Sequence, residues 1–397
     1  MTGRLKIVTV VGTRPEIIRL SRTIEALDRV TDHVLVHTGQ NYDYELNEIF
    51  FSELGIRAPD HFLKADATTL GSLLADVLTG TERLLLDIQP DAVVILGDTN
   101  SSISALMARR LKVPVYHLEA GNRSFDANVP EEVNRKMVDH VADYHLVYSE
   151  HSRRNLLAEG IRPETIVLIG SPMREILSHY ESDIGASTVL PRLGLERRGY
   201  ILASAHREEN VDDSTRLTML ITALEAVGKQ QACPVIVSTH PRTRKRLDAL
   251  GLLEQTTLDL HPPLGFLDYV QLQRSARCVI SDSGTISEES TILGFPAVTI
   301  RDAIERPEAI DAGGIITTGL RPADVVDAVS MTIAQHQQQG PVQAPLEYRV
   351  TDTSRRVVNT IRSTVSTHHQ RWGIRTPQRR PAPASPATTP ATVEVVL

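Results

Sequence analysis

The sequence predicts an α/β protein with two doubly wound parallel sheets. Short β-branched runs alternate with longer amphipathic segments along almost the whole chain, which is typical of strand–helix–strand repeats. The runs are apolar throughout, as in parallel strands that are buried on both faces. The alternation stops over residues 182–199, which hold three glycines and a proline. We therefore expect two α/β domains, at residues 1–182 and 199–350.

Eleven apolar runs are predicted to be strands. Six precede the break, at residues 5–11, 34–37, 92–96, 113–118, 144–148 and 166–169. Five follow it, at residues 200–203, 235–238, 277–281, 297–300 and 315–317. Amphipathic segments between the strands predict helices at residues 70–88, 131–143, 214–230 and 323–336.

The chain is expected to end in a helix and a tail. The segment 352–369 has a helical pattern, and we assign residues 351–372 to a C-terminal helix that packs back on the N-terminal domain. Residues 377–397 hold five prolines together with alanine, serine and threonine, and no periodic apolar face. Such a composition cannot bury enough apolar surface to fold, so we expect a disordered tail without chemistry.

The composition excludes several classes of protein. The 397 residues carry a formal charge of −7, which provides no basic field for binding nucleic acid. No apolar run reaches the roughly 18 residues of a membrane helix, and the N-terminus lacks the apolar stretch of a signal peptide. Cys233 and Cys278, the two cysteines, form neither a disulfide framework nor a metal cluster. We expect a cytoplasmic protein without a membrane or nucleic-acid partner.

Polar clusters follow six of the predicted strands. In open parallel sheets, ligands bind beyond the carboxyl ends of the strands, where these clusters lie. The recurrence of such clusters in both halves predicts a charged cleft between two domains. The clusters are residues 12–16, 97–100 and 119–123 in the first half and residues 205–210, 239–242 and 282–285 in the second.

The strongest candidate for phosphate binding is the segment 282–289, which follows a predicted strand and opens a helix. Thr285 and Glu288 have the spacing of a capping box, and free amides at a helix start can hold a diphosphate. A capped helix that binds nothing is an equal alternative. Cations that could reach the same anion are Arg14, Arg19, Arg207 and Arg301. The segment 301–308 also fits a surface ion-pair network.

The turn after the first strand differs from the common nucleotide-binding loops. It lacks the Gly-x-Gly-x-x-Gly pattern of nicotinamide enzymes and the lysine loop of P-loop NTPases. Instead, Thr13 is placed to cap a helix, and Pro15 suits the first position of that helix. Neither enzyme class is therefore favoured.

Four acid or base candidates lie near strand ends: Asp98, Glu119, Glu131 and His206. Carboxylates beside a ligand cleft suit proton transfer, above all where burial moves their pKa towards neutrality. The alternative for Glu131 and Glu132 is that they only open a helix, whose dipole favours acids there. By itself, His206 is more often a hydrogen-bonded structural histidine. No pair of ligands has the spacing of a zinc site.

The chain carries nine motifs in one order: GTRPE, TGQNYDYEL, GDTN, EAGNRSFDANVPEEVNR, GSPM, SAHREEN, STHPR, SDSGTISEES and ERPE. With them, residues 4–365 resemble the non-hydrolysing UDP-N-acetylglucosamine 2-epimerases, and most of all their branch from capsule and N-acetyl-L-fucosamine pathways. The resemblance implies a GT-B-like fold of two facing Rossmann-like domains with an interdomain cleft. It also implies inversion at C2 of a UDP-2-acetamido sugar, without a cofactor or metal, by a homodimer.

The resemblance implies roles for individual residues. It makes Asp98, Glu119, Glu131 and His206 the catalytic residues. The positions that match binding of the UDP-sugar are Arg14, Arg19, Arg123, Arg135, Ser283, Gly284, Thr285, Glu289 and Arg301. Gln40, Arg207 and His240 match an allosteric UDP-N-acetylglucosamine site.

Four features depart from the best-known pattern of this family. Arg19 replaces a lysine, Thr285 replaces a glycine, and Glu208 stands where an arginine is usual. The stretch that begins at Gln40 also differs, and it contributes to the allosteric site of several members. We therefore do not expect allosteric activation to be kept unchanged.

Our first hypothesis is the interconversion of UDP-N-acetylglucosamine and UDP-N-acetylmannosamine, by elimination of UDP to a 2-acetamidoglycal and its re-addition. The nearest alternative is the same chemistry on a UDP-2-acetamido-2,6-dideoxy-L-hexose, which forms UDP-N-acetyl-L-fucosamine. A retaining GT-B glycosyltransferase would share the fold but needs an acceptor pocket. A hydrolysing epimerase, which admits water, and a catalytically inactive sugar-nucleotide sensor are further alternatives.

Overall fold

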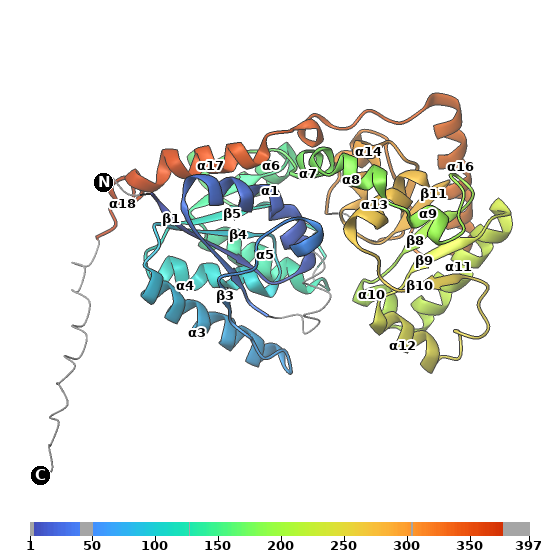
Figure 1. Ribbon diagram of the computed structural model, residues 1–397, viewed down its shortest axis with the longest axis horizontal. Helices are drawn as coiled ribbons and strands as arrows, with labels where there is room; N and C mark the ends of the chain where they lie inside the picture. The colour runs from blue at the N-terminus through green and yellow to red at the C-terminus, as the bar shows by residue number, and fades with distance from the viewer. Residues whose placement is uncertain (1–3, 40–50, 127, 303–304, 376–397) are drawn as a thin grey trace, which may run out of the picture.

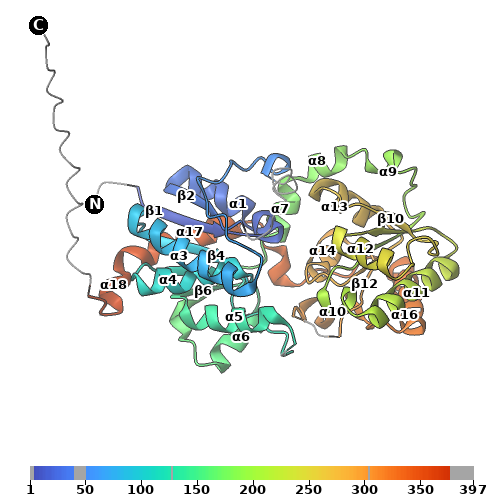
Figure 2. The same cartoon turned by 90° about the horizontal axis from the view of Figure 1, so that it is seen from below.

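The computed structural model describes residues 4–39, 51–126, 128–302 and 305–375. Two parallel sheets, each with helices on both faces, lie side by side along the long axis of the molecule (Figures 1 and 2). The predicted α/β class with two parallel sheets is therefore confirmed. The predictions for Gln40 and for the tail at 377–397 lie outside the described residues.

The first sheet has the strand order β3-β2-β1-β4-β5-β6-β7, and all neighbouring strands are parallel. Its order reverses between β1 and β4. The loops after these two strands therefore form a topological switch point, where doubly wound sheets bind ligands. The strands are β1 (Lys6–Val11), β2 (Asp32–His37), β3 (His61–Phe62), β4 (Ala92–Leu96), β5 (Val115–Leu118), β6 (Tyr144–Val147) and β7 (Ile166–Leu168).

The second sheet repeats this plan with the order β10-β9-β8-β11-β12-β13, again with parallel neighbours. Its switch point lies after β8 and β11. The strands are β8 (Ile201–Ser204), β9 (Val235–Ser238), β10 (Asp259–His261), β11 (Cys278–Ser281), β12 (Ala297–Thr299) and β13 (Ile316–Thr317).

All eleven predicted strands are present, and their ends differ from the prediction by at most two residues. The sequence did not predict β3 and β10, which lie at the outer edge of each sheet. Both are short and contain histidine or aspartate, so neither forms the apolar run that indicates a buried strand.

Helices cover both faces of the first sheet. On one face, α1 and α17 share an apolar core with the sheet, and on the other face α3, α4 and α5 share a second core. These two cores explain why the central strands are apolar at every position. The helices of this half are α1 (Arg14–Val30), α3 (Leu70–Ile88), α4 (Ser104–Arg110), α5 (Pro130–Val141), α6 (Glu150–Ala158) and α17 (Thr353–Thr364).

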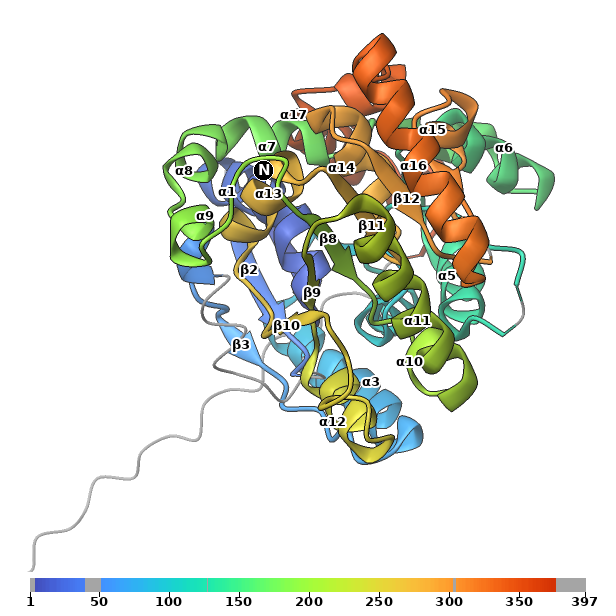
Figure 3. The ribbon, with the colours of Figure 1, turned by 90° about the vertical axis from the view of Figure 1, so that its right-hand side faces the viewer.

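The second sheet is covered in the same way, as Figure 3 shows, with α11 and α16 on one side and α13 on the other. The four helices predicted between strands correspond to α3, α5, α11 and α16, and α3 has the predicted bounds. The helices of this half are α9 (Val189–Arg192), α10 (Glu208–Val211), α11 (Ser214–Gln231), α12 (Pro241–Ala249), α13 (Phe266–Ser275), α14 (Ile286–Leu293), α15 (Glu308–Asp311) and α16 (Pro322–Gln339).

The chain crosses between the halves twice. It leaves the first half through α7 (Met173–His179) and α8 (Glu181–Ala186), and it returns to α17 and α18 (His368–Arg371), which lie over the first half in Figure 1. Between the crossings, the Glu53 carboxylate accepts the N–H groups of Phe266 and Leu267 at 2.9 Å each and so caps α13 from the opposite half. Contacts of this kind fix the two sheets relative to one another.

No described helix combines the length and the apolar character needed to span a membrane. The described residues also contain four short 3₁₀ helices, at Asn100–Ile103, Pro163–Thr165, Leu346–Arg349 and Val365–Thr367.

Candidate active site

Loops from both switch points meet between the two sheets. Residues 12–16 and 97–100 follow β1 and β4, and residues 205–210 and 282–285 follow β8 and β11. Ion pairs connect the halves there, because Arg135 binds Glu305 and Arg306 binds Glu119. The polar clusters at residues 97–100, 119–123 and 205–210 are therefore joined into one charged site, because Arg135 also binds Asp98 and Glu305 also binds Arg207.

Two arginines and two glutamates form a buried ring across the junction. Arg19 of α1 donates to Glu119 at 2.6 Å and to Glu288 at 2.5 Å, and Arg306 donates to the same two carboxylates. The four side chains are each at most a tenth exposed. Because an unpaired buried charge is very costly, the alternation of two cations and two anions is what makes this burial tolerable. The ring also ties the first half, through Arg19, to Glu288 in the second half.

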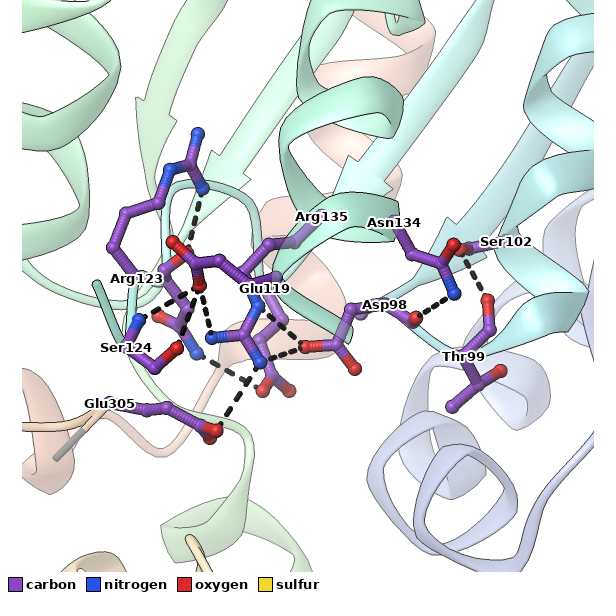
Figure 4. A network of polar contacts seen from close by, with 12 residues as sticks. Asp98, Thr99, Ser102, Glu119, Arg123, Ser124, Asn134, Arg135 and Glu305 are labelled. Carbon is purple, nitrogen blue, oxygen red and sulfur yellow. Dashed lines mark hydrogen bonds and ion pairs between the residues drawn. The ribbon is translucent and has the colours of Figure 1, made fainter. Parts of the chain in front are cut away.

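Asp98 follows β4 and is held by Arg135 of α5 (Figure 4). The Arg135 Nε and Nη2 atoms lie 3.0 and 2.5 Å from Asp98 Oδ2. Burial raises the pKa of Asp98 to about 6, because Arg135 offsets only part of the loss of hydration while Glu305, Glu119 and Glu131 add negative charge nearby. A carboxyl group with this pKa exchanges protons readily near neutral pH.

Glu119 follows β5 in an unfavourable backbone conformation, with φ of 64°. Its carboxylate accepts hydrogen bonds from Arg19, Arg306 and Asn122. Burial by itself would raise the pKa of Glu119, but the charges of Arg19 and Arg306 outweigh it and lower the pKa. Two neighbouring carboxylates thus have pKa values that move in opposite directions, a pattern typical of acid–base sites.

Glu131 and Glu132 open α5 and have different environments. Glu132 is buried, accepts the N–H of Ser124 at 3.0 Å and pairs with Arg135 at 3.2 Å, so it fixes the loop before the helix. Glu131 is half-buried, and its charge acts on both Asp98 and Arg207. Of the two acids, Glu131 is therefore the one whose charge raises the pKa of Asp98.

His206 follows β8 and is half-exposed, with 51% of its side-chain surface accessible. Its backbone N–H donates to the buried Asp282 carboxylate, and its Nδ1 lies 3.3 Å from the same group. Asp282 also accepts the N–H of Arg207 at 3.0 Å and the amide of Asn210 at 3.1 Å. Asp282 thus shapes the loop after β8 and presents the His206 ring to solvent at the site.

Three arginines converge on Glu305. Arg301 lies 2.9 Å, Arg207 3.2 Å and Arg135 3.4 Å from the Glu305 carboxylate. Burial would raise the pKa of Glu305, but Arg207, Arg135 and Arg301 together lower it far more. Glu305 therefore gathers cations from both halves beside Asp98, as Figure 4 shows for Arg135.

The start of α14 lies beside these cations. A Cβ atom added to Gly284 would lie 3.5 Å from Arg301 and 4.0 Å from Arg207. The predicted capping box of Thr285 and Glu288 is wrong, because Glu288 binds the arginine ring and Ser171 instead. Thr285 caps no amide and pairs with the Ser283 hydroxyl at 2.9 Å. The Glu288 side chain, which would have capped the start of α14, therefore binds Ser171 and the two arginines instead.

A small cavity opens beside this helix start, and its lining includes Ser283, Gly284, Arg301 and Arg306. The Nε atoms of Arg301 and Arg306 are buried and have no hydrogen-bond partner among the described residues. Unsatisfied buried donors are costly, and on a guanidinium they suit an anion. The two Nε donors therefore suit an anion, beside the Glu305 carboxylate that lines the same cavity and binds Arg301.

Glu289 lies one residue beyond Glu288 on α14 and is buried. Gln273 of α13 donates to its carboxylate at 2.5 Å. Burial raises the pKa of Glu289, and the hydrogen bonds from Gln273 and Thr285 reduce that shift only in part. The Glu289 carboxylate is therefore not a member of the buried ring formed by Arg19, Arg306, Glu119 and Glu288.

The prediction that Arg123 contacts the substrate needs correction. The Arg123 side chain is fully buried within the first half. Its guanidinium binds Glu159 through Nε and Nη2, and Asp139 and the Asn122 carbonyl through Nη1. Because these partners occupy all three of its nitrogens, we assign Arg123 a structural role.

The two described residues of the candidate allosteric set lie in different loops. Arg207 belongs to the Glu305 cluster, whereas His240 caps α12 by accepting the N–H of Arg242 at 3.2 Å. Arg14 opens α1 and is half-buried. The structure thus joins Arg207 to the catalytic candidates.

Several functional candidates were missed by the sequence reasoning. They are Asp282, Glu288, Glu305 and Arg306, all of them buried and charged. All lie in the motifs SDSGTISEES and ERPE, which was the signal available, but a motif does not reveal which of its acids is buried. In the described part of the chain, no three histidine, cysteine or carboxylate side chains are grouped as metal ligands.

Comparisons with known proteins identify the family. The family model for UDP-N-acetylglucosamine 2-epimerase matches residues 25–362. The structure of a UDP-N-acetylglucosamine 2-epimerase from Rickettsia bellii is 42% identical, covers 93% of this chain and all of its own, and superposes with a TM-score of 0.86.

Two further relatives extend the comparison. The Methanocaldococcus jannaschii UDP-GlcNAc 2-epimerase in complex with UDP-GlcNAc and UDP is 33% identical, with a TM-score of 0.85, over 90% of this chain and all of its own. A Pseudomonas aeruginosa UDP-2,3-diacetamido-2,3-dideoxy-D-glucuronate 2-epimerase is 35% identical over 83% of this chain and 93% of its own. The fold is thus GT-B-like, as the resemblance implied. The chain belongs to the UDP-N-acetylglucosamine 2-epimerase family and is an isomerase.

Proposed function

We propose that this protein interconverts UDP-N-acetylglucosamine and UDP-N-acetylmannosamine without hydrolysing them. The observation that carries the proposal is the pairing of Asp98, whose pKa is raised to about 6, with an arginine-rich helix start in the opposite half. The first feature suits proton exchange and the second suits a diphosphate. C2 epimerisation of a UDP-sugar needs both at once.

The proposed chemistry has two reversible steps. A base removes the C2 proton while the C1–O bond breaks, so that UDP leaves with the bonding electrons and C1=C2 forms. The resulting 2-acetamidoglycal and UDP stay in the site. A proton is then delivered to the opposite face of C2 as a UDP oxygen attacks C1. Because water would capture the intermediate, the site must remain closed during both steps.

We assign the proton transfers to Asp98 and Glu131. Both oxygens of Glu119 accept hydrogen bonds from arginine side chains, which leaves that carboxylate poorly basic. Asp98 is bound by Arg135 through a single oxygen, and Glu131 is near enough to influence its charge. Glu119 in this account holds Arg19 and Arg306 towards the leaving diphosphate, and His206 donates a hydrogen bond to it.

The nucleotide is expected to lie against the second half. Ser283, Gly284 and Thr285 open α14, and Arg301 and Arg306 line the adjacent cavity with unpartnered Nε donors among the described residues. Arg14, Arg19 and Arg135 supply positive charge from the first half. Glu289, whose carboxylate accepts a hydrogen bond from the neutral amide of Gln273, is assigned to the ribose hydroxyls.

The alternative substrates differ in the sugar that UDP carries. The relative from Pseudomonas aeruginosa, named for a diacetamido-glucuronate substrate, is as similar as relatives named for UDP-N-acetylglucosamine. The N-acetyl-L-fucosamine reading requires a 6-deoxy-L-sugar on the same nucleotide. All these substrates share the UDP group and the C2 proton on which the site acts.

Proton NMR of the protein with UDP-N-acetylglucosamine in deuterated water tests the proposal. We expect UDP-N-acetylmannosamine to appear with deuterium at C2, since the proton-exchanging groups equilibrate with solvent. Release of free UDP and free sugar would instead indicate hydrolysis. If this substrate gave no product while a UDP-2-acetamido-6-deoxy-L-hexose or the diacetamido-glucuronate did, the chemistry would stand and the substrate assignment would fall.

We also propose that the protein acts as a cytoplasmic homodimer. Leu70 and Leu86 on α3 and Val133 on α5 are exposed large apolar side chains, and the two helices cover the same face of the first sheet. A second copy of the chain that packed over these helices would remove this apolar surface from water. Sedimentation equilibrium measures the mass directly, and a monomer would contradict this part of the proposal.

A further inference from the structure

A buried polar network lies beneath the loops that carry Asp98 and Glu119. Its centre is Asp139 on α5, which is fully buried. One carboxylate oxygen lies 2.8 Å from Nδ1 of His117. The other accepts the backbone N–H of Gly121 at 3.1 Å and a nitrogen of Arg123 at 2.7 Å.

His117 extends this network to the second loop. It lies on β5, is fully buried, and its Nε2 is 2.7 Å from the carbonyl oxygen of Gly97, the residue before Asp98. A carbonyl oxygen can only accept, so Nε2 of His117 donates to Gly97, while Nδ1 lies within hydrogen-bond distance of Asp139. The ring therefore bridges the Gly97 loop to Asp139.

The loop of Glu119 needs such support because Glu119 is a non-glycine residue in the left-handed region, which glycine adopts at little cost. The φ angles of Gly97, Glu119 and Gly121 are 69°, 64° and 82°, all in the left-handed region. A Cβ atom at Gly121 would lie 2.3 Å from the Ser152 carbonyl oxygen, so no other residue fits there. A non-glycine residue such as Glu119 keeps this conformation only where the surrounding structure holds it. The hydrogen bond from the Gly121 N–H to Asp139 fixes the loop of Glu119, and the one between His117 and the Gly97 carbonyl fixes the loop of Asp98.

One face of α5 carries or holds the three acid candidates Asp98, Glu119 and Glu131. Glu131, Arg135 and Asp139 are spaced four residues apart and so lie in a row on the helix. The first is a proposed proton-transfer group, and the second binds Asp98. The third holds the loop of Glu119 directly and the loop of Asp98 through His117. The helix therefore sets the mutual placement of the acids.

We propose that Asp139 and His117 are positioning residues that fix Asp98 and Glu119 relative to one another without touching the substrate. The inference rests on the proposed function for its kinetic consequence. Burial alone would raise the pKa of Asp139, but the hydrogen bond and charge of His117 and the charge of Arg123 lower it, which keeps the carboxylate ionised. An ionised group is required to accept from all three donors at once.

The test compares two carboxylates of the same network. Asp139→Asn removes the charge that holds both loops. Glu159→Gln removes the other carboxylate of Arg123, and among the described residues Glu159 binds only Arg123 and His140. We expect kcat to fall about 10- to 100-fold in D139N, as for displaced catalytic groups, with KM and UDP affinity within about twofold. E159Q should keep the wild-type kcat.

Amide hydrogen exchange provides a readout that does not depend on turnover. In D139N, peptides that contain Gly97–Asp98 and Glu119–Gly121 should exchange faster than in the wild type, and in E159Q they should not. A wild-type kcat in folded D139N, or an equal loss in both variants, would overturn the positioning role. If the wild type epimerised no UDP-sugar, the proposed function would fail, yet unchanged exchange in D139N would still refute the positioning role by itself.

Two substitutions of His117 keep the inference testable if D139N does not fold. Glutamine places an amide nitrogen near the position of Nε2 and keeps the bond to Gly97. Asparagine places one near Nδ1 and keeps the bond to Asp139. Each breaks one half of the bridge, so H117Q should loosen the Glu119 loop and H117N the Asp98 loop, both with lower kcat. A wild-type rate in both variants would contradict the bridge.

Discussion

Replacement of Asp98 with asparagine should stabilise the protein at neutral pH while it abolishes turnover. Burial raises the pKa of Asp98 from 3.8 to about 6, which means that the folded state disfavours the carboxylate. Asparagine has the shape of the neutral carboxyl group, and its carbonyl oxygen can still accept from Arg135. If Asp98 performs the proposed proton transfer, it does so at the expense of stability.

The magnitude follows from the pKa shift. A rise from 3.8 to about 6 is roughly two pKa units, each worth about 1.4 kcal/mol, so ionised Asp98 costs about 3 kcal/mol of folding free energy. Because the folded pKa is the higher one, the wild type loses this stability as the pH rises from about 4 to about 6. The D98N protein does not titrate there, so it should exceed the wild type by about 3 kcal/mol above that window and match it below.

Urea denaturation of both proteins between about pH 4 and pH 8 measures this difference. Asp139→Asn is the matched control, because the pKa of Asp139 is lowered by its partners. Its loss should destabilise at neutral pH, and that deficit should shrink as the pH falls. A D98N protein less stable than the wild type at pH 7, or a difference that stays constant across the range, would refute this account of the site.

Three other substitutions test further parts of the site. Glu131→Gln should abolish epimerisation in the NMR assay and leave UDP affinity within about twofold in calorimetry, and wild-type turnover would remove Glu131 from the proton transfers. Arg301→Ala should weaken UDP binding about 10- to 100-fold through loss of a charged hydrogen bond, whereas Arg321→Ala, on the surface, should not. Glu288→Gln leaves two guanidinium groups with one carboxylate and should cost about 3 kcal/mol or more in urea denaturation. Glu150→Gln, in an exposed pair, serves as its control, and an equal effect of both would contradict the buried ring.

The sequence predicted the positions of the candidate catalytic residues better than their environments. Asp98, Glu119 and His206 lie at the strand ends where the pattern placed them. Glu132, which follows Glu131 directly, turns out to fix a loop, and Arg123 turns out to be buried with its guanidinium bound to groups of the first half. Glu132 has the same charge as Glu131 and lies in the same motif, and Arg123 has the same charge as the other arginines assigned to substrate binding. Only the direction of the side chain, which the folded structure sets, separates these residues.

Burial of charge was the least predictable property. Glu305 and Arg306 follow Arg301 in a segment that equally suggested a surface network, and the structure buries all three. Glu288 has the spacing of a capping residue but binds two arginines from different segments. In both cases decisive partners are distant in sequence, namely Arg135 and Arg207 for Glu305 and Arg19 for Glu288, and a local pattern contains no information about them.

By itself, the sequence determined the strands, the main helices and the loops that carry the chemistry. This was possible because apolar runs and helical periodicity are local properties that each segment carries alone. The tertiary structure decided which acids are ionised, which arginines remain for an anion, and how Asp139 joins two loops. These depend on distances between groups such as Arg19 and Glu288, which come together only when both sheets have formed and packed. Electrostatic energies change steeply with distance and burial, and both quantities exist only in the folded chain.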